Sequence, residues 1–174
     1  MLNLSLAKKE AVLVGIVLGS ASDVETMRVT RQVLEEFGIG SEMRILSAHR
    51  SPEELIQWVK GAKQTGTKVI IAAAGVAAHL AGVVAAHTVL PVIGVPMGGG
   101  ALQGVDALLS TVQMPRGTPV ATVAIGPAGA TNAALLALRI LALQDPVLEA
   151  KLLEYQKRLS AEALNADREL QKHN

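Results

Sequence analysis

The chain has 174 residues, of which half are apolar, 2% are aromatic and none is cysteine, and its formal net charge is +1. This length suits one domain with a substantial core, so a single domain is expected over residues 1–174. The balanced charge gives no reason to expect nucleic acid or a membrane surface as a partner. Absence of cysteine excludes disulfides and thiolate metal sites, which fits a cytoplasmic protein. Residues 1–10 lack the apolar run of a signal peptide, and the apolar stretches further on are too interrupted to span a membrane.

Apolar, β-branched segments alternate with helical patterns five times along the chain. Strands are predicted at residues 11–18, 41–46, 68–74, 91–95 and 119–125, and helices at 23–37, 52–64, 77–86, 101–110 and 131–143. Continuous apolar strands followed by crossover helices are typical of a parallel sheet that is covered on both faces. The pattern therefore predicts a doubly wound α/β core over about residues 11–143.

Several residues mark where the helices begin and end. Ser22 is expected to cap the first helix, which Gly38 ends. Ser51 is expected to cap the second helix, with Pro52 at its first position. Residues 147–170 are amphipathic and strongly charged, with one apolar side formed by Leu148, Leu152, Tyr155, Leu159 and Leu164. This pattern predicts a long terminal helix that packs on a neighbouring subunit.

In a doubly wound sheet, ligands bind beyond the carboxyl ends of the strands, which here points to the loops 19–23, 47–50, 75–82 and 97–100. Gly19, Ser20 and Ser22 place backbone amides and hydroxyl groups at a helix N-terminus, which favours an anion. The Asp23 carboxylate can accept hydrogen bonds from two neighbouring hydroxyl groups of a sugar. The segment is neither a dinucleotide-binding nor a Walker fingerprint, and a capped tight turn explains it equally well.

His49 and Arg50 give the sharper functional signal. An imidazole can accept and donate a proton near neutral pH, and a guanidinium can hold a phosphate or carboxylate with two hydrogen bonds. The alternative is a histidine that only caps a helix beside a solvated arginine. His79 lies in an apolar, small-residue segment, where a packing or interface role is the more common one. His87 and His173 are expected to be structural or solvated, and the spacing of the four histidines does not predict a metal site.

Seven short segments, in unbroken order between about residues 12 and 143, together resemble one family. They are GSASD (19–23), SAHRSP (47–52), AAHL (77–80), PVIGVP (91–96), STVQMP (110–115), PVATVA (119–124) and NAA (132–134). The family is N5-carboxyaminoimidazole ribonucleotide mutase, the catalytic subunit of the class I bacterial phosphoribosylaminoimidazole carboxylase of purine biosynthesis.

The resemblance implies a flavodoxin-like, three-layer α/β/α sandwich with a mainly parallel five-stranded sheet, assembled as a homo-octamer whose sites combine several subunits. It implies an isomerase without cofactor or metal, which moves a carboxylate from the exocyclic nitrogen of an aminoimidazole ribonucleotide to ring carbon C4. Carbon dioxide is released and recaptured on the way. A functional link to the ATP-dependent synthetase that forms the carbamate is also implied.

By the same resemblance, His49 shuttles the proton as the catalytic acid and base. Ser22 and Arg50 hold the phosphate, Asp23 holds the ribose, and Ser20 and Ser47 face the base and its carboxylate. The further substrate-binding positions are Gly19, Ala48, Ala74, Gly75, Val76, His79 and Leu80.

Two positions depart from the family pattern, which has a second glycine at Val76 and a proline at Ala81. Valine would be strained if position 76 requires a positive φ. One alternative is direct carboxylation of the ribonucleotide with carbon dioxide, although Arg50 and His79 favour the mutase. A second is a nucleotide-binding protein of the same fold without catalysis. A flavin or receiver-type domain fits least, since the acidic cluster and late lysine of receivers are missing.

Overall fold

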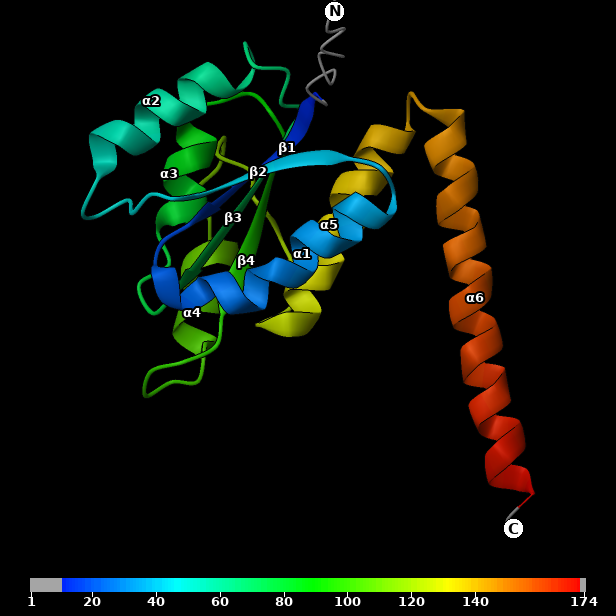
Figure 1. The fold of residues 1–174 in the computed structure, drawn as a ribbon. Coiled ribbons are helices and arrows are strands. Elements are labelled where there is room, and N and C mark those ends of the chain that lie inside the picture. Colours follow the sequence, from blue (N-terminus) through cyan, green and yellow to red (C-terminus); the bar gives the residue numbers. More distant parts are fainter. Residues whose placement is uncertain (1–10, 173–174) are drawn as a thin grey trace, which may run out of the picture. The chain divides into compact units, whose positions relative to one another are not determined.

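A computed structural model describes residues 11–172 (Figure 1); the predictions for residues 1–10 and for His173 lie outside this range. The centre is a five-stranded sheet in the order β2-β1-β3-β4-β5, and each neighbouring pair runs parallel. The strands are β1 (Val12–Leu18), β2 (Gly40–Ile45), β3 (Val69–Gly75), β4 (Val92–Met97) and β5 (Ala121–Thr122). This is the flavodoxin-like order, so the predicted fold class is confirmed.

Helices cover both faces of this sheet (Figure 1). On one face lie α2 (Pro52–Ala62), α3 (Leu80–Ala86) and α4 (Val105–Val112). On the other lie α1 (Val24–Glu36) and the first part of α5 (Pro127–Ala142), where the Thr30 hydroxyl donates a hydrogen bond to the Ala130 carbonyl at 2.8 Å. Aliphatic side chains of β1, β3 and β4 fill the core, as expected for strands buried on both faces.

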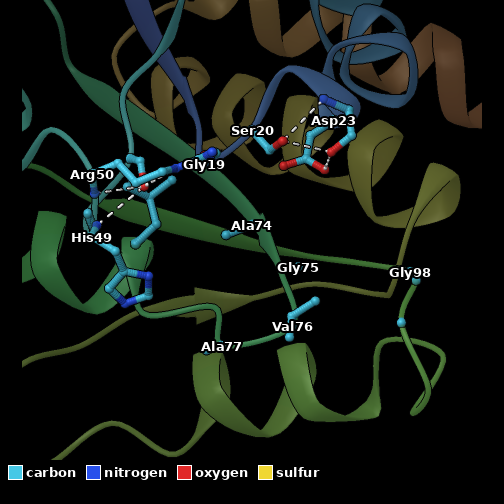
Figure 2. A pocket seen from close by; sticks show the side chains of 16 residues that line it. Gly19, Ser20, Asp23, His49, Arg50, Ala74, Gly75, Val76, Ala77 and Gly98 are labelled. Carbon is cyan, nitrogen blue, oxygen red and sulfur yellow. Dashed lines mark hydrogen bonds between the residues drawn. The ribbon is translucent and has the colours of Figure 1, made fainter.

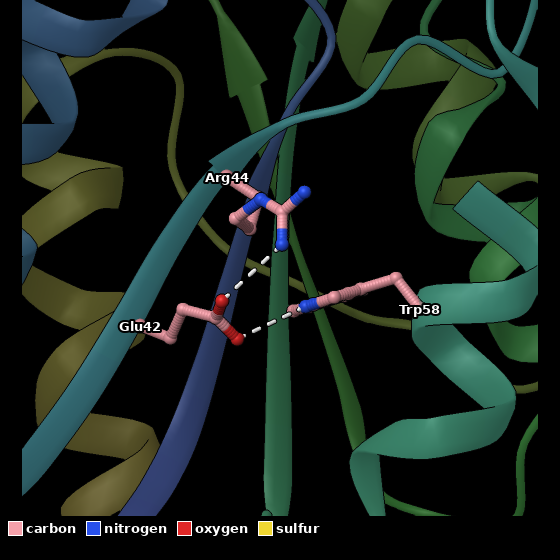
Figure 3. A network of polar contacts seen from close by, with 3 residues as sticks. All are labelled: Glu42, Arg44 and Trp58. Atoms are coloured by element: carbon pink, nitrogen blue, oxygen red, sulfur yellow. Dashed lines mark hydrogen bonds and ion pairs between the residues drawn. The ribbon is translucent and has the colours of Figure 1, made fainter. Parts of the chain in front are cut away.

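A polar network joins α2 to the edge strand β2 (Figure 3). The Trp58 indole N–H donates to Glu42 Oε2 at 3.1 Å, and Arg44 donates to Glu42 Oε1 at 3.4 Å. Gly15 makes room for the indole, because a Cβ there would lie 2.9 Å from the Trp58 ring. The single tryptophan thus fixes how α2 packs over the first two strands.

The start of the first helix differs from the prediction. Ser22 lies inside a short 3-10 turn, η1 (Ala21–Asp23), and Ser20 caps that turn by accepting a hydrogen bond from the Ser22 backbone N–H. The expectation that Ser22 is the N-cap of the first helix is therefore wrong, because Ser20 caps the 3-10 turn and Asp23 is the N-cap of α1, without a side-chain capping bond. Gly38 ends α1 as predicted, with a φ of 79°.

Three later elements are shorter or displaced relative to the prediction. The fifth strand is only two residues long, although the backbone N–H groups of Val123 and Gly126 still donate to carbonyls of β4. α3 begins at Leu80, after the tight turns at Val76 and Ala77. α4 begins at Val105, because Gly104 before it has a φ of 89°, which interrupts a helical run.

The chain divides into two compact units, Met1–Ala137 and Leu138–Asn174. The second unit contains α6 (Pro146–Gln171), where the Asp145 carboxylate caps the helix by accepting from the backbone N–H groups of Val147 and Leu148. Leu148 and Leu152 are buried, whereas Leu159 is 45% exposed. That α6 packs on a neighbouring subunit stays a prediction. Within residues 11–172, every helix is too short or too polar to cross a membrane.

Candidate active site

A pocket of about 620 Å³ lies at the carboxyl ends of the strands (Figure 2). Its position between the ends of β1 and β3 is the switch point of this strand order, where ligands bind in such sheets. All four expected loops contribute to it. The lining residues are Gly19, Ser20, Ser22, Asp23, Ser47, Ala48, His49, Arg50, Ala74, Gly75, Val76, Ala77, Leu80, Gly98, Gly99 and Gly100.

The loop after β1 brings a buried carboxyl group to the pocket. Asp23 is 7% exposed, and its Oδ2 atom is buried without a hydrogen-bond partner among the described residues. Burial raises the pKa of the Asp23 carboxyl, while hydrogen bonds from the Ser22 side chain and the Ser20 backbone act in the opposite direction. A ligand hydroxyl that donates to Oδ2 would satisfy this atom, since unpaired buried acceptors are costly.

The loop after β2 is held together by the Ser47 hydroxyl. This oxygen accepts from the backbone N–H groups of His49 and Arg50, at 3.3 and 3.2 Å, and from Arg50 Nε at 3.4 Å. The Ser51 hydroxyl in turn accepts from the Ser47 backbone N–H at 2.9 Å. Arg50 Nη2 donates to the Gly19 carbonyl at 2.9 Å, which ties this loop to the first one. The backbone that carries His49 is thereby fixed beside the first loop.

His49 is paired with a second imidazole. Its Nε2 lies 2.9 Å from Nδ1 of His79, and the two rings meet edge to face with centroids 5.0 Å apart. One nitrogen must donate and the other accept, so the contact couples the tautomers of the two rings. His79 fixes the orientation of His49 through this contact.

The loops after β3 and β4 form the remaining side of the pocket. Val76 follows β3 with a φ of 55°, so the condition under which a valine is strained at this position is met. Gly98, Gly99 and Gly100 follow β4 and present backbone without side chains.

The predicted site residues therefore converge on one pocket, with one difference. His79 is not among the lining residues and reaches the site through His49. Sequence reasoning missed this pairing, because a histidine 30 positions away on an apolar segment carries no local sign of its partner. His87, at the end of α3, donates its Nδ1 N–H to the Val83 carbonyl oxygen, 2.9 Å away. Among residues 11–172, no cluster of His, Asp and Glu is arranged to hold a metal ion.

The fold and pocket define a flavodoxin-like α/β protein with an imidazole pair, a guanidinium and a buried carboxyl at its switch point. Residues 13–162 match the AIR carboxylase family, and the chain belongs to that family.

Relatives with known names agree with this assignment. The chain is 55% identical over 150 residues to the N5-carboxyaminoimidazole ribonucleotide mutase of Pyrococcus horikoshii, covering 86% of this chain and 84% of that one. It is 56% identical to the bifunctional purine synthesis protein purC/E of Dictyostelium discoideum, covering 84% of this chain and 15% of that one. The crystal structure of Treponema denticola PurE superposes with a TM-score of 0.82 at 29% identity, covering 91% of this chain and 98% of that chain.

Proposed function

We propose that this protein is an N5-carboxyaminoimidazole ribonucleotide mutase of purine biosynthesis. The observation that carries the proposal is His49, which lines the switch-point pocket with Arg50 and Asp23 and is oriented by His79. The name of the Pyrococcus relative supports the same reaction. An imidazole beside a guanidinium and a carboxyl suits proton transfer on a phosphorylated sugar ligand.

In the proposed reaction His49 gives one proton to the exocyclic nitrogen and later takes one proton from ring carbon C4. The protonated imidazole gives its proton to the exocyclic nitrogen as the carbamate C–N bond breaks, and the electron pair of that bond stays on nitrogen. This yields carbon dioxide and the aminoimidazole. Ring carbon C4 then attacks carbon dioxide with the electron pair of the enamine, which forms the C–C bond. His49 removes the proton from C4, so the ring regains aromaticity and the imidazole regains its starting charge.

The other polar residues are assigned to binding. Arg50 keeps donors beyond the one that bonds the Gly19 carbonyl, and with Ser22 it is proposed to hold the phosphate. Asp23 is proposed to accept from the ribose hydroxyls through its unpaired Oδ2. Ser20 and Ser47 are proposed to face the base and its carboxylate.

Replacement of His49 tests the proposal. His49→Asn keeps a polar side chain but cannot gain and lose a proton near neutral pH. Turnover of freshly made N5-carboxyaminoimidazole ribonucleotide, without ATP or metal, should therefore fall about 10²- to 10⁴-fold. Nucleotide affinity, measured by calorimetry, should stay within a few-fold. His87→Asn, outside the pocket, is the matched control and should keep wild-type turnover. Near-normal turnover by His49→Asn would refute the acid–base assignment.

Direct carboxylation is the second candidate, because the matching family is described as AIR carboxylase. It predicts that aminoimidazole ribonucleotide plus bicarbonate is converted as fast as the carbamate. The mutase predicts a clear preference for the carbamate. Nucleotide binding without either conversion would instead identify a binding protein.

Assembly and context are part of the same proposal. We infer a homo-octamer in the cytoplasm, with a functional link to the ATP-dependent synthetase that supplies the carbamate. The bifunctional Dictyostelium relative supports a link to other purine-synthesis activities, since this chain corresponds to only part of that protein.

A further inference from the structure

Ser51 lies at the predicted N-cap position of α2, but its hydroxyl group does not cap the helix. An N-cap serine ordinarily accepts a hydrogen bond from a backbone N–H in the first helical turn. Asp145 does so at the start of α6. The first turn of α2 instead begins with Pro52, which has no N–H, and carries Glu53 and Glu54, whose charges suit a helix N-terminus. The Ser51 hydroxyl is therefore available for another contact.

The Ser51 hydroxyl holds the backbone of Ser47. Its Oγ atom accepts from the Ser47 N–H at 2.9 Å and donates to the Ser47 carbonyl at 3.3 Å. The Ser51 backbone N–H donates to the same carbonyl at 3.0 Å. These hydrogen bonds between two serines close the turn 47–51, whose middle residues are Ala48, His49 and Arg50.

One further contact connects Ser51 to His49. The side chain of Ser47, the residue that Ser51 holds, accepts from the backbone N–H groups of His49 and Arg50 at 3.3 and 3.2 Å. His49 lies in the turn, outside the helices and strands, and its ring contacts His79. Figure 2 shows His49 and Arg50 together on this turn, with Arg50 reaching toward Gly19. The position of the imidazole therefore depends on the shape of the turn.

We propose that Ser51 is a positioning residue, whose hydroxyl group keeps the turn 47–51 in the shape that aims the His49 imidazole at the ligand. The inference rests on the proposed mutase function, in which His49 carries the proton. Ser51 does not line the pocket, so it acts on the reaction through the turn. Proton transfer requires hydrogen-bond reach, and a displacement of about 1 Å can lower a rate about 100-fold.

Three substitutions of Ser51 separate this role from helix capping. Ser51→Ala removes the hydroxyl group, and Ser51→Thr keeps it. Ser51→Asn caps a helix as well as serine does, but its polar atoms stand one bond further from the backbone, so it cannot replace both bonds to Ser47. If the hydroxyl group only stabilised α2, asparagine would be the better replacement. If it holds the turn, threonine is the better one.

The measurements are kcat and KM with freshly made carbamate across a pH series, nucleotide Kd by calorimetry, and the thermal midpoint of each variant. Turnover is measured well below the lowest midpoint. The kcat of Ser51→Ala and Ser51→Asn should fall about 10- to 100-fold, with Kd nearly unchanged, whereas Ser51→Thr should stay close to the wild type. The pH profile should lose height and keep its shape, because a displaced imidazole still titrates.

Ser110→Ala is the matched control. The Ser110 hydroxyl also donates to a backbone carbonyl, that of Asp106 at 2.7 Å, but it lies in α4 and outside the pocket lining. Loss of this bond removes a similar contact from a part-buried serine without touching the turn. The kcat of Ser110→Ala should equal that of the wild type.

The outcomes separate the inference from the proposed function. If the wild type converts the carbamate and Ser51→Ala does so with an equal kcat, the inference is refuted while the mutase function stands. Turnover restored by Ser51→Asn but not by Ser51→Thr would also refute it, because Ser51 would then act as a helix cap. A raised KM and Kd at unchanged kcat would show a role in binding instead. If the wild type converts no carbamate, the mutase function fails and the inference fails with it.

Discussion

At the scale of single residues, Asp23 is a side chain of the pocket that lowers the free energy of unfolding. Asp23 is 7% exposed, and its Oδ2 atom is buried without a hydrogen-bond partner among the described residues. Burial raises the pKa of this carboxyl above its ordinary value of 3.8. The ionised Asp23 carboxylate therefore lowers the free energy of unfolding near neutral pH. Residues that serve binding often lower stability in this way.

Asp23→Asn should consequently stabilise the protein and weaken its ligand binding. Below pH 3.8 the Asp23 carboxyl is protonated in both the folded and the unfolded protein. Between pH 3.8 and the raised pKa of the folded state, only the folded protein holds the proton. The stability of the wild type therefore falls as the pH rises through that window. The variant's advantage in thermal midpoint should thus grow from acid to neutral pH and then level off. Its nucleotide affinity should fall about tenfold or more, the effect of losing a charged acceptor.

Asp167→Asn, in the exposed part of α6, is the matched control and should show no such pH-dependent advantage. A thermal midpoint of Asp23→Asn that stays at or below the wild type at every pH would contradict the assignment of Asp23 as a destabilising buried acid.

The sequence predicted the site residues that lie within one short motif. It did not predict contacts between residues that are far apart in the chain. The segment 47–50 identified His49 and Arg50, because both lie where a parallel strand ends. The family pattern pointed to Val76 as a position where a positive φ would cause strain, but only the structure shows that its φ is 55°. The contact between His49 and His79 was not predictable, because it depends on how two loops meet in space.

At the scale of elements, glycines decide how closely the first part of α5 approaches the sheet. A Cβ on Gly129 would overlap the carbonyl oxygen of Ala124 and also approach Val95 on β4. Gly61 in α2 is the opposite case, because a Cβ there would meet nothing within 4 Å. The same substitution should therefore have opposite effects in the two helices.

Gly129→Ala should lower the free energy of unfolding by about 3 kcal/mol or more, since the backbone has to move to admit the methyl group. Gly61→Ala should raise it by about 0.5–1 kcal/mol through the lower entropy of the unfolded chain. Thermal or urea unfolding of both variants checks this contrast. A Gly129→Ala protein as stable as the wild type would mean that α5 shifts freely along the sheet.

Element types were predictable from periodicity, whereas several boundaries were not. Continuous apolar runs predicted β1, β3 and β4, because strands buried on both faces need no polar alternation. β5 proved two residues long, whereas the apolar run predicted a strand over residues 119–125. The starts of α3 and α4 depend on left-handed residues, Val76 and Gly104, whose conformations the apolar pattern does not encode.

At the scale of the whole molecule, α6 exposes several large apolar side chains to solvent. Leu153, Leu159, Leu164 and Leu170 are all more than two-fifths exposed. An exposed leucine series on a long charged helix is typical of a helix that packs on another surface. The predicted octamer supplies such a surface on a second copy of the chain.

Leu159→Glu should therefore weaken assembly, because it places a charge in the apolar side that continues from Leu148, Leu152 and Tyr155. Light scattering should show a smaller mass at micromolar concentration. Ala161→Glu adds the same charge about 200° away around the helix, given about 100° per residue, and should leave the mass unchanged. If Leu159→Glu keeps the wild-type mass, α6 does not carry the assembly, and the subunit contacts lie in the unit Met1–Ala137. If both variants dissociate, charge on α6 rather than its apolar side controls association.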